Sequence, residues 1–363
     1  MALIVQKYGG TSVANPERIK AVVSRVAKYK RDGHDVVVVV SAMSGETNKL
    51  ISLAEEMMPH PDNRELDAIV SSGEQVTSGL TALGLINEGF KAKSYAGHQI
   101  KIKTDKAYSK ARILKIDDEK IHDDLKNDFV VVVAGFQGVS EYGEVTTLGR
   151  GGSDTTAVAL ASALNAERCE IYTDVKGIYT ADPRLVKSSK LISNISYNEM
   201  LEMASLGAKM HPRSIEIAAI NNIEMIIKHT MHESEGTRLN NNEIKMEIRN
   251  AVTGIPTSKG VSKVTINNID DKPGIASSIF LPLSEMGISV DVIVQTAGND
   301  GKTNLSFTLN DNDLESCVNE LIKKVIFDEI PAKAIASDPI EKSPSLSPIA
   351  NGDAFLAAIN VSG

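Results

Sequence analysis

The sequence predicts an α/β protein, with an open and mostly parallel β-sheet covered by helices on both faces, followed by a smaller α+β domain. Three observations support this prediction. Strand segments such as residues 36–40 are too continuously apolar to have a solvated face. The order strand, loop, helix and strand repeats through the first half of the chain. Beyond residue 257 the pattern changes to strands in which apolar and polar residues alternate.

The first strand–helix–strand unit has clear boundary signals. Residues 2–8 predict a buried strand, and Asn15 and Pro16 predict the cap and first residue of the helix that follows. Gly33 is predicted to end this helix before the strand at residues 36–40. Farther on, residues 130–139 predict a buried strand that ends in a glycine-bracketed loop at residues 135–138.

The second half predicts a separate domain. Residues 233–257 are polar, and we divide the chain in this region into residues 1–245 and 246–325. The second part has the predicted order strand, helix, strand, strand, helix, which is typical of a small α+β sandwich. The tail, residues 326–363, is rich in proline and serine and predicts no fold of its own.

Composition excludes several classes of function. The 363-residue chain has a net charge of -8, no tryptophan and 4% aromatic residues, which argues against nucleic-acid and acidic-membrane partners. The apolar run at residues 36–40 is too short to span a bilayer, and no signal peptide is recognised. Cys169 and Cys317 are far apart and show no metal spacing, which predicts a reducing, cytoplasmic location.

The most informative stretch is residues 146–164, where a glycine-rich loop runs into an alanine-rich helix predicted to begin near Ser153 or Asp154. Loop glycines and helix-start amides favour a bound anion, and the fork of Arg150 suits a carboxylate or phosphate. We therefore expect an anionic small molecule with an amine, held by Arg150 and Asp154 together. The alternative is a glycine-rich turn with a solvated arginine. The loop residues are Gly149, Arg150, Gly151 and Gly152.

Other candidate residues follow strand ends, where ligands bind in such sheets. Lys7 lies beside Gly9 and Gly10, and it either meets an anion there or extends to solvent. Glu74, at a helix start, either accepts an ammonium group or complements the helix dipole. Small hydroxyl residues follow the second strand, namely Ser41, Ser44 and Thr47.

The loop after residue 173 is either a nucleotide site or an ordinary turn. Its polar residues are Asp174, Tyr179, Asp182 and Arg184. Lys209, at a helix break, is placed to reach the same anion as Lys7. A Mg²⁺ held by phosphates and one or two carboxylates leaves little trace in a sequence, so we assign no metal ligands. No Walker loop, zinc pattern or Ser/His/Asp arrangement is recognised.

Several ordered motifs resemble those of the bacterial aspartate kinases over roughly the first 240 residues. They are KYGGTS at 7–12, VVVVVSAMSGETN at 36–48, SSGEQV at 71–76, AGFQGV at 134–139, TTLGRGGSDTTAVALA at 146–161 and YTDVKGIYTADPR at 172–184. Residues 260–325 resemble the first of the two ACT modules by which that family senses amino acids. The resemblance implies the amino-acid kinase fold, a ferredoxin-like ACT domain and the reaction of ATP with L-aspartate to 4-phospho-L-aspartate and ADP.

The resemblance also implies roles for individual residues. The catalytic residues are Lys7, Lys209 and Asp174. The aspartate site comprises Thr47, Glu74, Arg150, Gly151, Gly152 and Asp154. The ATP site, with Mg²⁺ bridging the phosphates, comprises Lys7, Tyr8, Gly9, Gly10, Ser41, Ser153, Thr173, Asp174, Tyr179, Asp182, Arg184 and Lys209. The regulatory residues are Asp271, Pro273, Gly274, Ile275, Ala276 and Gln295. In the implied reaction the attacking group is the β-carboxylate of aspartate. Its reference pKa is about 3.9, so it is already ionised and needs no general base.

The resemblance places the reaction at the start of lysine, threonine and methionine synthesis, with lysine or threonine as the expected effector and a dimer through the ACT region. Two departures stand out: GAKMHPRS at 207–214 is one residue short, and residues 326–363 contain no recognisable second ACT module. Two alternatives remain, and these departures motivate the second of them. One is a kinase for a glutamate-type substrate, and the other is a lysine or threonine sensor that has lost turnover.

Overall fold

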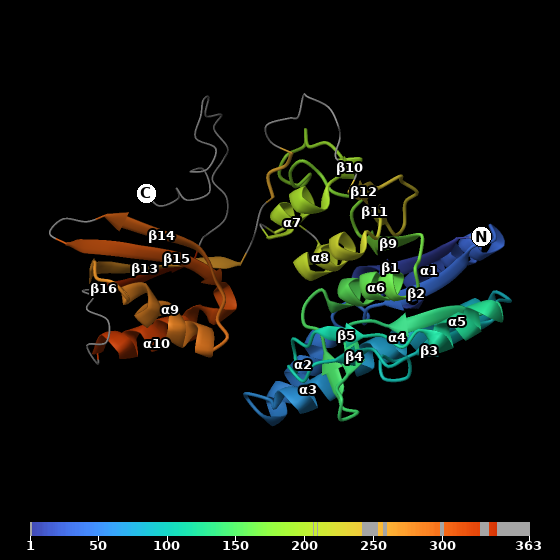
Figure 1. The fold of residues 1–363 in the computed structure, drawn as a ribbon, viewed down its shortest axis with the longest axis horizontal. Coiled ribbons are helices and arrows are strands. Elements are labelled where there is room, and N and C mark those ends of the chain that lie inside the picture. Colours follow the sequence, from blue (N-terminus) through green and yellow to red (C-terminus); the bar gives the residue numbers. More distant parts are fainter. Residues whose placement is uncertain are drawn as a thin grey trace. The chain divides into compact units, whose positions relative to one another are not determined.

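The structure is a computed structural model that describes residues 2–205, 207–208, 210–241, 253–256, 260–297, 301–326 and 334–339. The chain divides into two compact units, residues 1–257 and 258–363 (Figure 1). Our division into residues 1–245, 246–325 and 326–363 remains a prediction. Lys209 and most of the tail lie outside the described residues.

The first unit is built on an eight-stranded sheet with the order β10-β12-β11-β9-β1-β2-β6-β3. Strand β12 runs antiparallel to β11, while the other neighbouring strands pair in parallel. The prediction of an open, mostly parallel sheet is therefore confirmed. The strands are β1 (Leu3–Tyr8), β2 (Asp35–Val40), β3 (Ala92–Tyr95), β6 (Val130–Ala134), β9 (Arg168–Thr173), β10 (Asn194–Ile195), β11 (Met225–His229) and β12 (Thr237–Leu239).

Helices cover both faces of this sheet, because successive valines of β2 point to opposite sides and both sides are buried. Val36, Val38 and Val40 pack with α1 (Pro16–Arg31) and α4 (Ser72–Asn87). Val37 and Val39 belong to the core on the other face. The helices of that face are α5 (Glu119–Lys126), α6 (Gly152–Ala163), α7 (Tyr197–Ser205) and α8 (Pro212–Asn221).

The start of α1 follows the sequence signals. The Asn15 side chain accepts a hydrogen bond from the Arg18 backbone N–H at 2.9 Å, and Pro16 is the first helical residue. This arrangement satisfies one helix-start donor and removes another. The short helical turn η1 (Gly10–Val13) lies between β1 and α1.

The predicted buried strand is confirmed as β6, but the predicted glycine-bracketed loop is wrong in part, because residues 137–139 form another strand. Phe136 has a φ of 69°, so the chain turns there and leaves the large sheet after β6. The next strand belongs to a small four-stranded sheet with the order β5-β4-β7-β8, which we did not predict. Its strands are β4 (Lys103–Thr104), β5 (Ile113–Lys115), β7 (Gln137–Val139) and β8 (Val145–Thr147), and α2 (Glu46–Met57) and α3 (Asn63–Val70) complete the unit.

The second unit has an antiparallel sheet with the order β14-β15-β13-β16. Its elements are β13 (Val261–Asp270), α9 (Ile275–Glu285), β14 (Val290–Ala297), β15 (Lys302–Asn310), η2 (Asp311–Asp313), α10 (Leu314–Ile326) and β16 (Ala334–Pro339). The helices lie on one face of this sheet (Figure 1). Phe307 belongs to the core that they form with it. The predicted order of elements is confirmed, whereas β16, formed by the tail, was not predicted.

Cys169 and Cys317 are both free and buried, each in a different unit. None of the helices in the described part of the chain has the length and apolar character needed to cross a membrane.

Candidate functional site

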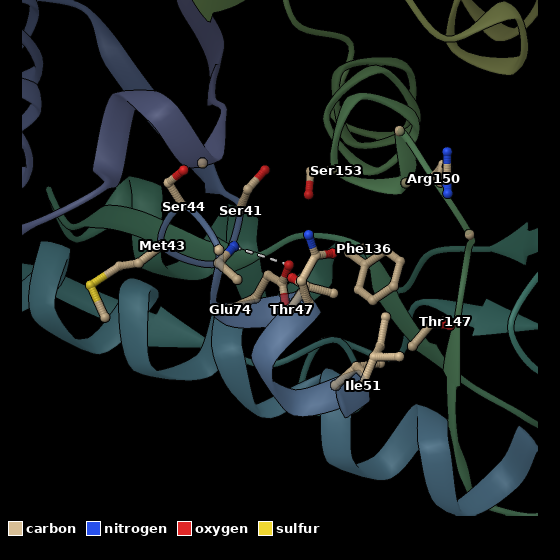
Figure 2. Close-up of a pocket in the computed structure, with 18 of the residues that line it drawn as sticks. Ser41, Met43, Ser44, Thr47, Ile51, Glu74, Phe136, Thr147, Arg150 and Ser153 are labelled. Atoms are coloured by element: carbon tan, nitrogen blue, oxygen red, sulfur yellow. Dashed lines mark hydrogen bonds between the residues drawn. The ribbon is translucent and has the colours of Figure 1, made fainter. Parts of the chain in front are cut away.

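A cavity of about 690 Å³ opens at the carboxyl ends of β1, β2, β6 and β9 (Figure 2). Its wall is formed by the loops that follow these strands, by the loop between β8 and α6, and by parts of α2, α3 and α4. The parallel sheet brings these loops to one edge. The predicted site residues that line the cavity are Lys7, Gly10, Ser41, Ser44, Thr47, Glu74, Gly149, Arg150, Gly151, Gly152, Ser153 and Asp174.

Lys7 is the last but one residue of β1, and its amine does not extend to solvent. The Nζ atom lies 2.6 Å from Oδ1 of Asp154, and each side chain is only 12% exposed. Of the two interpretations of Lys7 left open by the sequence, extension to solvent is therefore wrong, and the anion that Lys7 meets in the structure is the Asp154 carboxylate. Its role toward a ligand phosphate stays a prediction. The ion pair also changes the expectation for Asp154, which holds Lys7 instead of lining the cavity beside Arg150.

The cap of α6 differs from the prediction. The helix begins at Gly152, and its cap is Gly151, which adopts a left-handed conformation with a φ of 67°. Neither Ser153 nor Asp154 caps the helix, since both lie inside its first turn and no side-chain cap bond is present. The prediction of a helix start near Ser153 is therefore confirmed to within one residue, whereas the prediction that Ser153 or Asp154 caps the helix is wrong. The helix start lies at the cavity wall.

Glu74 is 3% exposed in the first turn of α4. Its Oε1 accepts a hydrogen bond from the Ala42 backbone N–H at 3.0 Å, as Figure 2 shows. Its Oε2 is buried and finds no hydrogen-bond partner among the described residues. Burial raises the pKa of this carboxyl to about 7, and the Ala42 N–H opposes the shift. A buried acceptor without a partner is costly, so this oxygen is suited to a ligand cation.

Other predicted nucleotide residues do not line the cavity. Tyr8 is fully buried, stacks on Tyr172 with ring centroids 4.7 Å apart and donates to Gln6. A binding role for Tyr8 therefore rests on its main chain alone. Arg184 forms two hydrogen bonds with the Asp182 carboxylate, at 3.0 and 2.7 Å.

The remaining nucleotide residues lie along the same loops. Gly9 donates its N–H to the Tyr172 carbonyl, and the Thr173 hydroxyl donates to Asp174. Tyr179 forms an isolated β-bridge with Leu191. The nucleotide roles of Gly9, Thr173, Tyr179, Asp182 and Arg184 stay predictions. Lys209 lies outside the described residues.

Sequence reasoning missed part of the wall. Asp67 of α3 lines the cavity although it is 1% exposed, and both of its oxygens accept hydrogen bonds from the neighbouring loops. Burial raises its pKa, against the effect of those hydrogen bonds. A carboxylate among the apolar positions of a short amphipathic helix was the available signal. The missed apolar wall residues are Met43, Ile51, Leu66, Val70 and Phe136.

The wall combines groups of complementary charge. Lys7, Arg150 and the amides at the start of α6 suit anions, whereas the free oxygen of Glu74 suits a cation. The apolar wall lowers the local dielectric and strengthens each of these interactions. The site is thus suited to an amino acid, which carries both charges, beside a second anionic group.

Comparison with known proteins agrees with this chemistry. Residues 2–229 match the model of the amino acid kinase family. The chain is 50% identical over 322 residues to an aspartate kinase of Pseudomonas putida, an alignment that covers 88% of this chain and 78% of that protein.

Solved structures give the same result. The structure of an aspartate kinase from Synechocystis has a TM-score of 0.61 at 37% identity, covering 93% of this chain and 58% of that one. E. coli aspartokinase III in complex with aspartate and ADP has a TM-score of 0.70 at 27% identity, covering 85% and 78% of the two chains. The same enzyme in complex with lysine and aspartate has a TM-score of 0.73 at 25% identity, covering 93% and 85%. This chain belongs to the aspartate kinases of the amino acid kinase family.

Proposed function

We propose that this protein transfers the γ-phosphoryl group of ATP to the β-carboxylate of L-aspartate, giving 4-phospho-L-aspartate and ADP. The observation that carries the proposal is a cavity that holds the unpartnered oxygen of Glu74 together with the guanidinium of Arg150. Such a pair fits the ammonium and α-carboxylate of one amino acid. The 50% identity to an aspartate kinase and the ADP and aspartate bound to E. coli aspartokinase III support the same reaction.

In this proposal the chain's own residues bind and orient the two reactants. Arg150 binds the α-carboxylate, and Glu74 accepts from the α-ammonium group. Lys7, held by Asp154, offsets the negative charge of the transferring phosphoryl group, and the amides at the start of α6 add to this effect. The β-carboxylate is ionised at neutral pH, so no base is needed. The barrier is lowered by bringing two anions together in a preorganised site.

We further propose Mg²⁺ as the metal. Within the described residues no group of three or more His, Cys, Asp or Glu side chains could hold a metal ion by itself. Mg²⁺ fits a different arrangement, in which ATP phosphates and one or two carboxylates share it. Asp174, at the end of β9 and on the cavity wall, is the residue that would hold it. When bound, the ion neutralises phosphate charge.

We also propose that the second unit is an ACT domain that senses lysine or threonine and forms a dimer. Lysine is bound in the E. coli aspartokinase III structure, which supports lysine as the first effector to test. Within the unit, Gln295 on β14 donates to Asp271 at 3.3 Å, and Gly274 caps α9 with a φ of 93°. These contacts bring together two of the predicted regulatory segments.

A direct assay tests the proposed reaction. The protein is mixed with ATP, Mg²⁺, L-aspartate and hydroxylamine, which traps acyl phosphates as hydroxamates. We expect aspartyl hydroxamate and ADP in equal amounts, and much less hydroxamate when L-glutamate replaces L-aspartate. Folded protein that forms no hydroxamate above background contradicts the proposal. Calorimetry that detects lysine or threonine binding without ADP formation would instead favour the sensor.

A further inference from the structure

The loop that carries Arg150 has little stiffness of its own. It connects β8 to α6, and its glycines Gly149 and Gly151 adopt left-handed conformations with φ values of 78° and 67°. Glycine adopts many other conformations at little cost. The Arg150 side chain has no hydrogen-bond or ionic partner among the described residues. Its direction therefore depends on contacts that hold the loop from outside.

The first such contact comes from α3. Oδ2 of Asp67 accepts the backbone N–H of Thr147 at 2.7 Å, and Oδ1 accepts the Thr147 hydroxyl at 2.6 Å. The backbone N–H of Ser109 donates to the same carboxylate, at 2.9 and 3.1 Å from its two oxygens. A buried carboxylate thus joins the end of β8 to the segment at Ser109 through their backbone amides, with charge-assisted hydrogen bonds.

The second contact comes from α8. The guanidinium of Arg213 donates from Nη1 to the Leu148 carbonyl at 2.8 Å and from Nη2 to the Ala111 carbonyl at 2.9 Å. Arg213 is partly buried, and desolvation lowers its pKa. The fixed fork of a guanidinium suits two carbonyls in this way.

The two contacts hold the same pair of segments with opposite backbone polarity. Asp67 takes the amides of residues 109 and 147, while Arg213 takes the carbonyls of residues 111 and 148. The segments also bond directly, since the Ala111 N–H donates to the Thr147 carbonyl at 2.9 Å. We call Asp67, Arg213 and these four backbone positions the loop clamp.

We propose that Asp67 and Arg213 are positioning residues, which through the loop clamp set the direction from which Arg150 meets the carboxylate of the amino-acid substrate. The substrate in this statement rests on the proposed function, whereas the clamp rests on the hydrogen bonds alone. Neither residue transfers a group or a proton. When a group that positions the substrate, here Arg150, is displaced by about 1 Å, the displacement is enough to lower the rate strongly.

The kinetic test compares Asp67→Asn and Arg213→Met with two matched variants. Asp124→Asn removes another buried carboxylate, which lies on α5 and accepts hydrogen bonds from Tyr95 and Lys93. Arg168→Met removes a partly buried arginine at the start of β9. We expect the KM for aspartate to rise at least about tenfold in the clamp variants, with the KM for ATP changed less than about twofold. The matched variants should lose stability without a selective rise of the KM for aspartate over the KM for ATP.

Two further readouts separate positioning from general destabilisation. Arg213→Lys should recover only part of the aspartate KM, because an ammonium cannot hold two carbonyls in the same fork. Added guanidinium ion at millimolar concentration should lower the aspartate KM of Arg213→Ala and leave Arg168→Ala unchanged. Equal changes in both KM values, or the same split in the matched variants, would overturn the proposal.

A measurement that does not need activity keeps the clamp testable on its own. Hydrogen exchange of the backbone amides of Ser109 and Thr147 should be slow in the unchanged protein and at least about tenfold faster in Asp67→Asn. Asp124→Asn should leave both amides protected. Unchanged exchange in Asp67→Asn would refute the clamp even in an active enzyme. A protein that shows the exchange pattern but makes no aspartyl hydroxamate would refute only the proposed function.

Discussion

At the scale of single residues, Glu74 shows how burial prepares a charged group for a ligand. One oxygen of the carboxyl accepts a hydrogen bond from the Ala42 N–H, and the other has no partner in the described part of the protein. Burial raises its pKa to about 7, so near neutral pH the free protein holds this proton part of the time. An ammonium ligand favours the ionised form, which makes binding depend on pH.

The first prediction concerns this dependence. The affinity for L-aspartate should fall below pH 7, approaching about tenfold per pH unit, because binding must first remove the Glu74 proton. Calorimetry between pH 5 and 8 measures this affinity. Repeating it in buffers of different ionisation enthalpy measures how many protons binding releases. Glu74→Gln should bind weakly with a flat profile. Glu88→Gln, at the far end of the same helix, should keep the full profile; a flat profile in the unchanged protein contradicts the interpretation.

The second prediction concerns stability. Unfolded Glu74 has its ordinary pKa of 4.5, and the folded value is about 7. Between these values the folded state holds more protons, so the free energy of unfolding falls as pH rises, by about 3 kcal/mol in total. Glu74→Gln has no carboxyl at this position, so its free energy of unfolding lacks this fall with rising pH. Its stability relative to the unchanged protein should therefore grow from pH 5 to pH 8 in denaturant unfolding without ligand. Glu88→Gln should show no such growth, and equal pH dependence in all three proteins would refute the assignment.

The sequence predicts some of these residues better than others, for physical reasons. Lys7 is predictable because a lysine at the end of a buried strand, beside two glycines, needs an anion. Glu74 stays ambiguous, because the hydrogen bond that leaves only one of its oxygens free comes from the backbone of Ala42, which belongs to a loop remote in sequence. Asp67 leaves one signal, a charge among the apolar positions of α3. The partners of Asp67 and Arg213 leave none, because they are backbone groups remote in sequence.

At the scale of elements, the junction between β8 and α6 depends on Gly151. A Cβ atom there would lie 2.5 Å from His211, and the φ of 67° is unfavourable for other residues. The sequence indicates the glycine-rich loop and a helix start near Ser153 or Asp154, but it predicts these two residues as the cap, since such residue types usually cap helices. Packing against His211 and the left-handed turn override that preference. The same effect ends β6, where Phe136 turns the chain away from the large sheet.

The third prediction tests this junction. Gly151→Ala should lose more than about 2 kcal/mol of stability, from backbone strain together with the contact with His211, and should raise the KM for aspartate. Gly143→Ala is the matched control, because its φ is 81° and nothing lies within 4 Å of an added Cβ. It should lose about 1 kcal/mol with unchanged kinetics. Thermal unfolding and steady-state kinetics measure both variants, and equal losses of stability would argue against the His211 contact.

At the scale of the whole molecule, the two units differ in how far the sequence determines them. The parallel sheet is predictable because buried valine runs admit few other arrangements. The second unit is predictable in its element order, yet β16 is not, because its pairing with β13 joins a proline- and serine-rich tail to a strand remote in sequence. The predicted dimer through this unit depends instead on which apolar residues the unit exposes.

The exposed edge of the second unit gives the last prediction. Strand β14 lies at the edge of its sheet, and Val292, Ile293 and Val294 are 44%, 50% and 39% exposed. An apolar edge strand favours pairing with a second copy, and lysines facing each other across a two-fold axis would repel. We expect a dimer by light scattering and a monomer for Val292→Lys/Val294→Lys. Leu281→Lys, an exposed site on α9, should remain dimeric. If Leu281→Lys dissociates while the β14 variant does not, the contact lies on the helical face instead.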